Sequence, residues 1–379
     1  MESAEVWQNF TDVIKSPETE KEYSRAVRAF LNRVGMGDAA LIAKAQEDPA
    51  WIEGEITKVI RSEKVRVEAG AISPNTVGNI TAPLRLFLTM NDVRVNWEKL
   101  GHLLPRGRSH GTDRAPTLEE IKVLVENADE RMKAAVLVMV SSGIRAGAWP
   151  SLTWGDVAPC KAGDRVVAAS VVVYRGTPEE YRTFITPEAY DALAAYMERR
   201  KAPRTFYATL KSGKREFRKV EGEKISPKSA LLASQGEPLG VEGLKHLVMR
   251  AWRKRGLRTD RVRRHEFKGI HGFRKYFKTH AEQVMHPINV EILMGHAVGV
   301  SSSYYKPQEK ELLEDYLKAV PYLSITDAYR SKSEVEKKLE TEKATWQSEK
   351  ADLVAQVKEL REMVLGIVKD RQAELAANP

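Results

Sequence analysis

Hydrophobic side chains recur at the spacing of one helical face between residues 16 and 104. The four repeats are Tyr23, Val27, Phe30 and Leu31; Leu41, Ile42 and Ala45; Ile52, Ile56, Val59 and Ile60; and Ile80, Leu84, Leu86 and Phe87. This spacing places each apolar set on one side of an α-helix. Because few alternations typical of strands interrupt it, residues 1–104 are predicted to form a small all-helical domain.

Residues 105–116 interrupt this pattern. They contain two prolines, two glycines and three arginines, and no apolar periodicity. Such a composition predicts an exposed basic linker. The segment is either a simple tether or a tether that also follows a polyanion.

Residues 117–322 alternate between helical and strand patterns. Thr117 and Glu120 form a capping box that opens a helix, and a buried helix over residues 132–140 ends near Gly143. Residues 166–174 and 181–185 are rich in β-branched and aromatic side chains and flank a Gly-Thr-Pro turn, which predicts two strands. Further helices are expected over 187–200, 241–255, 273–283 and 289–294, and 201–228 is a lysine-rich, weakly patterned insertion.

The fold class predicted from these patterns is mainly α with a small β-sheet. It comprises an N-terminal helical domain, a mixed α/β second domain and a helical tail over residues 323–379. In the tail, Leu339, Trp346, Leu353, Leu360 and Ile367 recur every seven residues, but Glu336, Lys343 and Lys350 occupy positions of that seam that should be apolar. The tail is therefore either a short coiled coil of about two heptads that binds a partner or a second copy, or a helix that packs on its own domain or stands free in solvent.

Charge and composition narrow the function classes. The 379 residues carry a net charge of +9, and residues 245–278 contain thirteen Lys or Arg and only two acids. A basic face of this kind suits a polyanionic partner, although excess lysine also occurs on ordinary soluble surfaces. The single cysteine, Cys160, excludes an internal disulfide framework and a cysteine-rich zinc site, and fits a reducing cytoplasm. The longest apolar run, residues 134–140, is too short to span a bilayer, so a soluble intracellular protein without a membrane partner is expected.

One set of polar residues in the second domain is suited to phosphoryl transfer. It comprises Arg145, His271, Arg274, His296 and the adjacent Tyr304 and Tyr305. Arginine makes bidentate contacts to phosphate and keeps its proton, histidine transfers protons near neutral pH, and a tyrosine hydroxyl can attack phosphorus. His271 and Arg274 are three residues apart, so a helix would direct both into one site. No metal or cofactor is predicted.

The order of these motifs resembles that of the tyrosine recombinase (phage integrase) family. Ser-Gly-Ile-Arg, ending at Arg145, is similar to the family's first arginine box, and His-Gly-Phe-Arg, ending at Arg274, is similar to its His-x-x-Arg box. Leu-Met-Gly-His, ending at His296, is similar to its histidine box, and Tyr305, nine residues later, is at the position of its nucleophile. The resemblance extends over residues 117–307. The N-terminal domain is similar to the family's core-binding domain in size and position only.

This resemblance implies a recombinase or integrase that acts on double-stranded DNA as a homo-oligomer, a tetramer on DNA. Tyr305 is then the nucleophile that forms a 3′-phosphotyrosyl link, with Tyr304 as its rival. Arg145, Arg274 and His296 stabilise the transition state, and His271 helps to accept the tyrosine proton. Neither ATP nor a metal takes part.

Two positions depart from the family pattern. The acid that usually follows the first arginine by three residues is Ala148 here, and the lysine of the β-hairpin, the family's general acid, is replaced by Arg175. Arginine is a poor proton donor because it holds its proton too tightly. Three readings stay open: Arg175 acts as an electrostatic substitute, Lys211 or Lys214 of the insertion takes the role, or leaving-group protonation is inefficient.

Two alternatives to a recombinase follow from the same residues. One is a type IB topoisomerase-like enzyme that relaxes supercoils without strand exchange. The other is a DNA-binding architectural protein that has lost turnover through the changes at Ala148 and Arg175.

Overall fold

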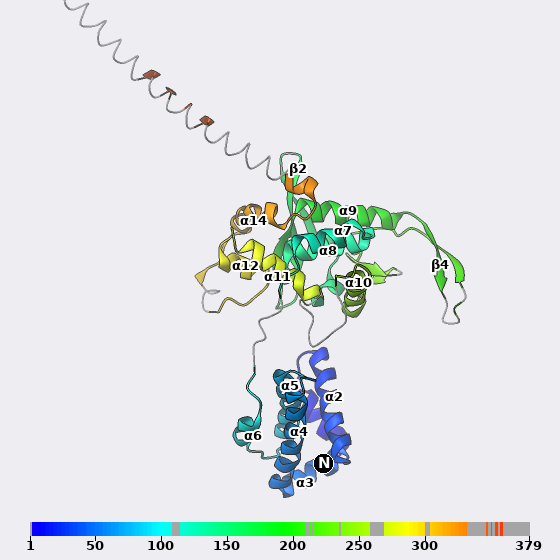
Figure 1. The fold of residues 1–379 in the computed structure, drawn as a ribbon, viewed down its shortest axis with the longest axis vertical. Coiled ribbons are helices and arrows are strands. Elements are labelled where there is room, and N and C mark those ends of the chain that lie inside the picture. Colours follow the sequence, from blue (N-terminus) through cyan, green and yellow to red (C-terminus); the bar gives the residue numbers. More distant parts are fainter. Residues whose placement is uncertain are drawn as a thin grey trace, which may run out of the picture. The chain divides into compact units, whose positions relative to one another are not determined.

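The computed structural model describes residues 2–107, 114–209, 213, 215–234, 236–257, 269–299 and 304–331, together with residues 346–347, 350, 353–354 and 357–358. The chain divides into two compact units, with residues up to 112 in the first and most of the remaining chain in the second (Figure 1). The two units are described separately. The predicted tail, residues 323–379, is described up to residue 331 and at the isolated positions above, among which Trp346, Leu353 and Val357 are exposed; the rest of it lies outside the described residues.

Six helices form the described part of the first unit: Ser3–Thr11 (α1), Pro17–Val34 (α2), Asp38–Glu47 (α3), Pro49–Glu68 (α4), Pro74–Met90 (α5) and Trp97–Leu103 (α6). Proline at the first helical position starts α2, α4 and α5, where a missing N–H costs no hydrogen bond. The predicted helices are confirmed as α2 to α5. Helix α1 was not predicted, because only two of its apolar side chains, Val6 and Phe10, mark its buried face; Phe10 packs edge-on against Phe87 in the core.

The helices of the second unit surround one buried helix, Glu130–Ser142 (α8). The others described are Leu118–Glu126 (α7), Pro187–Lys201 (α9), Val241–Lys254 (α10), Gly269–Ala281 (α11), Pro287–Leu293 (α12) and Glu309–Leu323 (α14), with 3₁₀ turns at Ala146–Ser151 (η1) and Trp154–Asp156 (η2). Helix α8 packs against α7, α9, α11 and α14 (Figure 1). Residues 134–142 are all buried, which explains the unbroken apolar run in the sequence.

The sheet beside α8 is a three-stranded antiparallel meander. Its strands are Val157–Ala162 (β1), Arg165–Val173 (β2) and Tyr181–Ile185 (β3), in the order β1-β2-β3. The two predicted strands are confirmed as β2 and β3, with Val173 opposite Tyr181 at the turn. Strand β1 was not predicted, because most of its positions are exposed and its side chains show no apolar alternation.

The segment over 201–228 was predicted to be a weakly patterned insertion without strands, and this prediction is wrong. The segment contains an antiparallel pair, Arg204–Thr209 (β4) and Arg215–Val220 (β5), in register from Arg204↔Val220 to Thr209↔Arg215. In Figure 1 this pair projects from the rest of the second unit. A short pair, Ala233–Ser234 (β6) and Glu237–Pro238 (β7), precedes α10. Helix α14 was also missed, although its buried side chains, among them Leu312, Tyr316 and Leu323, have helical spacing.

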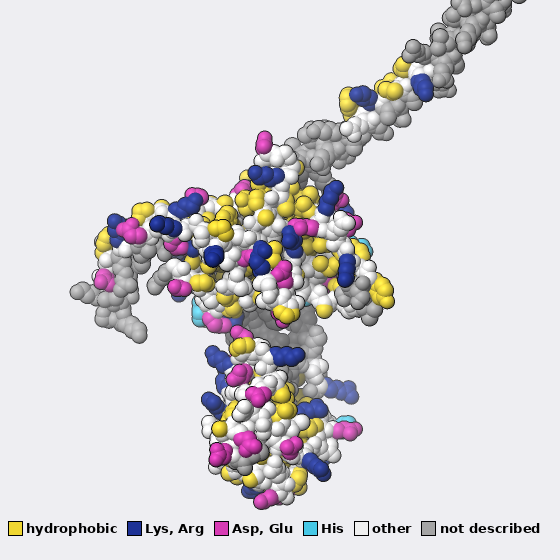
Figure 2. Space-filling model, turned by 180° about the vertical axis from the view of Figure 1, so that it is seen from behind, with side chains coloured by type: hydrophobic (Ala, Val, Ile, Leu, Met, Phe, Trp, Pro, Cys, Tyr) yellow, Lys and Arg dark blue, Asp and Glu magenta, His cyan; other side chains and the backbone are white. Residues whose placement is uncertain are grey.

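The surface carries both signs of charge. On the face shown in Figure 2, lysine and arginine side chains are interspersed with aspartate and glutamate over both units. None of the helices in the described ranges combines the length and the apolar character that crossing a membrane requires. The residues from 258 to 268, which supply much of the predicted basic stretch, lie outside the described part of the chain.

Gly143 ends α8 and turns the chain toward Arg145. Its φ is +63°, a left-handed conformation that glycine adopts without strain. A Cβ at this position would lie 2.6 Å from Cδ1 of Phe277, a fully buried side chain of α11. Both the backbone conformation and the close approach of α11 therefore require glycine here.

We predict that Gly143→Ala destabilises the protein by about 2–4 kcal/mol, since left-handed strain of about 1 kcal/mol adds to overpacking of about 1–3 kcal/mol. Gly163→Ala is the matched control: its φ is +61°, but nothing lies within 4 Å of the added methyl. Gly163→Ala should therefore be destabilised by the left-handed strain alone, about 1 kcal/mol. Equilibrium urea unfolding measures both variants, and equal losses would show that the contact with Phe277 is unimportant.

Candidate active site

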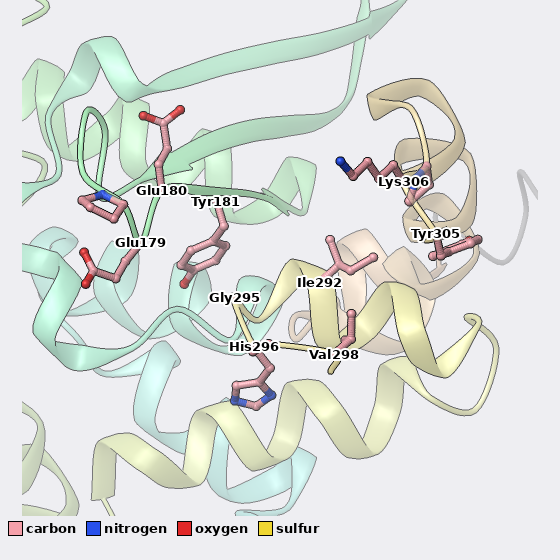
Figure 3. Close-up of a pocket in the computed structure, with 12 residues that line it drawn as sticks. Glu179, Glu180, Tyr181, Ile292, Gly295, His296, Val298, Tyr305 and Lys306 are labelled. Carbon is pink, nitrogen blue, oxygen red and sulfur yellow. The ribbon is translucent and has the colours of Figure 1, made fainter. Parts of the chain in front are cut away.

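Two cavities of the second unit meet at His296. The first, called here the arginine cavity, has a volume of about 570 Å³ and is lined by Ile144, Arg145, Ala146, Lys245, Met249, Gly269, Ile270, His271, Arg274 and His296. The second, the tyrosine cavity, has a volume of about 400 Å³ and is lined by Pro178, Glu179, Glu180, Tyr181, Ile292, Gly295, His296, Ala297, Val298, Tyr305, Lys306 and Pro307 (Figure 3). The structure thus brings four of the six predicted site residues to one cavity and a fifth, Tyr305, to its neighbour.

Arg274 is buried and is held by the ends of two helices. Its Nη1 donates to the carbonyl of Gly143, and its Nη2 donates to the carbonyl of Met294 at 2.7 Å. These carbonyls follow the last turns of α8 and α12, where helices leave acceptors unsatisfied and carry partial negative charge. Burial is the main cause that lowers the pKa of Arg274, and the positive charge of Arg145 lowers this pKa further. The guanidinium is thus fixed in position beside a second cation.

Arg145 is held by the turn that follows α12. Its Nη2 donates to the carbonyl of Gly295 at 2.9 Å. Gly295 has a φ of +66°, and a Cβ there would lie 2.5 Å from the ring of Tyr181, so only glycine fits. Ala148, the residue three positions after Arg145, is fully buried. A backbone carbonyl therefore orients Arg145 in this chain.

His296 connects Arg274 to a chain of charged groups. Its Nδ1 contacts the Glu291 carboxylate, and its Nε2 lies 2.6 Å from Nη2 of Arg274. Because a carboxylate accepts, the proton belongs on Nδ1, and Nε2 accepts from the guanidinium. Burial would raise the pKa of Glu291, but hydrogen bonds from Lys278 and His296 outweigh it and hold this pKa below its ordinary value. Glu291 thus fixes the imidazole ring.

The remaining polar residues of the arginine cavity come from two helices. His271 lies one turn before Arg274 on α11, at the exposed side of the cavity. Lys245 comes from α10, which packs against both η1 and α11, and its ammonium pairs with Glu242 on the same helix. In the sequence, Lys245 stands out only as part of the basic stretch over 245–278. No sequence signal separates it from the neighbouring cations.

Tyr305 lies in the tyrosine cavity, and its hydroxyl is held by another residue of the second unit. Its hydroxyl donates to Oδ1 of Asn289 at 2.9 Å, and the Asn289 amide donates to Asp315 at 2.8 Å. Figure 3 shows the Tyr305 ring directed away from His296, with Ile292 between them in this view. Tyr305 is 38% exposed, whereas the rival Tyr304 is 87% exposed. The structure therefore does not bring the predicted nucleophile into contact with the cations.

Arg175 lies in neither cavity. Its Nε donates to the buried carboxylate of Asp156, and its Nη2 reaches the carbonyl of Gly155 at 3.4 Å. Burial would raise the pKa of Asp156, but hydrogen bonds from Arg175 and Thr153 hold this pKa below its ordinary value. Arg175 thus anchors its turn to η2. The alternative lysines, Lys211 and Lys214, lie outside the described residues.

Tyr181 is a site residue that the sequence analysis treated only as part of a strand. Its hydroxyl is buried beside Arg274 and Arg145. Burial raises the pKa of Tyr181, and the positive charges of the two arginines oppose this shift. In the part of the chain that the structure describes, no group of three or more His, Cys, Asp or Glu side chains has the geometry to hold a metal ion.

The fold of the chain is similar to that of solved integrase structures. One is a fragment of lambda integrase, a dimer bound to a COC′ core site, with a TM-score of 0.52, 16% sequence identity, and coverage of 81% of this chain and 95% of that one. Another is the Tn1549 transposon integrase in complex with circular intermediate DNA, with a TM-score of 0.51, 15% identity, and coverage of 82% and 97%. No protein-family model and no curated protein matches the sequence. The predicted fold class, mainly α with a small antiparallel sheet, is confirmed.

We predict that Glu291→Gln lowers the free energy of unfolding by on the order of 1 kcal/mol at pH 7. The pKa of Glu291 is lowered in the folded state, so its carboxylate contributes stability above its unfolded-state pKa of about 4.3. That contribution is lost as the pH falls through the folded-state pKa. The difference between wild type and variant should therefore shrink as acid is added.

Urea unfolding at neutral and at acidic pH measures this difference. Glu282→Gln is the control, because it removes the second carboxylate partner of Lys278, at 3.2 Å, and Glu291 keeps its contact with His296. A difference for Glu291→Gln that is the same at both pH values would contradict the prediction.

Proposed function

We propose that this protein is a site-specific DNA recombinase of the integrase type, which cuts and rejoins DNA strands through a covalent link to Tyr305. The observation that carries the proposal is the convergence of Arg145, His271, Arg274 and His296 on one cavity. These residues come from three segments, the first of which lies more than a hundred positions before the other two. The similarity of the fold to lambda and Tn1549 integrases supports it.

The cavity suits a phosphodiester because its cations are fixed before the substrate arrives. Arg145 and Arg274 each use part of their donors on carbonyls, and a guanidinium has five N–H groups in all. Their remaining donors can meet the negative charge that grows on the non-bridging oxygens in the transition state. His271, at the exposed side of the cavity, is the base that accepts the phenol proton.

In the proposed reaction, the Tyr305 oxygen attacks phosphorus as the bond to the 5′ oxygen breaks. The products are a 3′-phosphotyrosyl link and a free 5′ hydroxyl. A 5′ hydroxyl from a second strand then attacks the same phosphorus and releases Tyr305. Because the ester bond is exchanged and not hydrolysed, the reaction needs no external energy source. Strand exchange between two DNA duplexes involves several protomers, and a tetramer on double-stranded DNA is the assembly proposed.

We predict that wild-type protein forms a covalent adduct with a nicked suicide duplex that carries its target site, and that Tyr305→Phe abolishes the adduct. The nick lets the cleaved strand diffuse away, so the intermediate accumulates. Tyr304→Phe is the matched control that keeps the adduct, since it removes the neighbouring hydroxyl and leaves Tyr305 in place.

Denaturing gel electrophoresis of end-labelled DNA detects the adduct. Its persistence in Tyr305→Phe would overturn the assignment of the nucleophile. DNA binding without any adduct in the wild type would favour the architectural alternative. Adduct formation and supercoil relaxation without exchange between two sites would favour the topoisomerase-like one.

For this reaction Tyr305 has to leave Asn289 and turn toward the cations. The hydrogen bond that holds it contributes about 1 kcal/mol, which corresponds to a population shift of about fivefold. We predict that Asn289→Ala raises the rate of adduct formation by up to about fivefold. Single-turnover cleavage of the suicide duplex measures this rate, and a marked fall in a variant with unchanged thermal stability would show that Asn289 assists the reaction.

A further inference from the structure

The arginine cavity contains a lysine to which the predicted catalytic set gives no role. Lys245 lines the cavity together with Arg145, His271, Arg274 and His296. Arg175, the residue that matches the family's lysine in sequence, is tied to Asp156 and lines neither cavity. Lys245 therefore adds an ammonium, which can donate a proton, to a cavity whose other cations are held in place.

The helical position of Lys245 explains how it reaches the site. Leu244, Val248 and Trp252 recur every four residues and bury one face of α10 in the core. Lys245 and Met249 follow one residue later on the adjoining face, and both line the cavity. Because α10 packs on η1 and on α11, this face borders the segments that carry Arg145 and Arg274.

The contacts of Lys245 leave its ammonium able to move. It pairs with Glu242 three residues earlier, and the two side chains are 50% and 73% exposed. Ion pairs this exposed are weak and exchange with solvent. A phosphodiester that enters the cavity carries a charge that competes for the same ammonium, whereas Arg175 is bound to a carboxylate that is only 6% exposed.

We propose that Lys245 is the general acid that protonates the leaving 5′ oxygen, an assignment that rests on the function proposed above. As the Tyr305 oxygen forms its bond to phosphorus and the phenol proton passes to His271, the bond from phosphorus to the 5′ oxygen breaks. The electron pair of that bond goes to the oxygen, which takes a proton from the Lys245 ammonium. In the rejoining step the neutral amine accepts the proton of the attacking 5′ hydroxyl. An ammonium can serve in this way because it releases its proton far more readily than a guanidinium does.

The test compares an ordinary phosphodiester with one whose 5′ bridging oxygen is replaced by sulfur. A thiolate leaves without protonation, so the sulfur substrate does not need a general acid. Lys245→Ala should slow single-turnover adduct formation on the ordinary duplex by about 10²–10⁴-fold. On the sulfur duplex, the rate of adduct formation by Lys245→Ala should be within a few-fold of the wild-type rate.

Three variants sharpen the result. Lys245→Arg keeps the positive charge but donates poorly, so it should be slow on the ordinary duplex and normal on the sulfur duplex. Lys254→Ala removes an exposed lysine from the last turn of the same helix and should behave as wild type on both. Arg274→Ala removes a charge that both substrates need and should be slow on both.

The outcomes separate this assignment from the proposed function. Wild-type protein that forms no adduct with either duplex refutes both. An active wild type with a fully active Lys245→Ala or Lys245→Arg refutes the role of Lys245 alone. The role of Lys245 is also refuted if the sulfur duplex restores the rate of adduct formation in Arg175→Ala but leaves that of Lys245→Ala slow.

Discussion

The site depends on two guanidinium groups held by backbone carbonyls at the ends of α8 and α12. A buried cation is costly unless it is hydrogen-bonded, and two adjacent cations also repel each other. Here the carbonyls of Gly143 and Met294 hold Arg274, and the carbonyl of Gly295 holds Arg145. Carbonyls offer partial negative charge without cancelling a full positive charge. The two guanidinium groups are therefore held in position and still attract an anion. A carboxylate at the Ala148 position would weaken that attraction.

Two glycines make this arrangement possible, because each of these carbonyl-bearing turns has a positive φ and a close neighbour. Gly143 lies against Phe277, and Gly295 lies against Tyr181, at distances that no Cβ tolerates. Phe277 lies on α11, the helix that also carries Arg274, and Tyr181 lies on β3 with its own hydroxyl buried beside the two arginines. The backbone turns, the packing of the core and the position of the cations are thus one structural unit.

The sequence predicted the parts of this unit that follow from local periodicity. Helix α8 was evident from its apolar run, and β2 and β3 from their β-branched side chains. The three-residue spacing of His271 and Arg274 correctly placed both on one helix that faces a single cavity. Long-range packing decided the rest. Nothing local distinguishes Lys245 from neighbouring cations of α10, and the pairing of Arg175 with Asp156 depends on how the hairpin turn folds onto η2. Strand β5 was missed because four of its six residues are charged and leave no apolar alternation, and its partner β4 is a run of only six residues.

The orientation of Tyr305, whose hydroxyl is bonded to Asn289 and not to a cation, bears on whether the site is competent. The phenol is held by one neutral hydrogen bond to Asn289, which contributes about 1 kcal/mol, so a substrate needs little binding energy to release it. The arginine positions, in contrast, depend on several buried contacts between α8, α11 and α12. A nucleophile on a weakly held segment and cations on a rigid frame suit a reaction that begins only after DNA has filled the cavity. The resting orientation of Tyr305 is therefore compatible with catalysis, whereas a displaced Arg274 would not be.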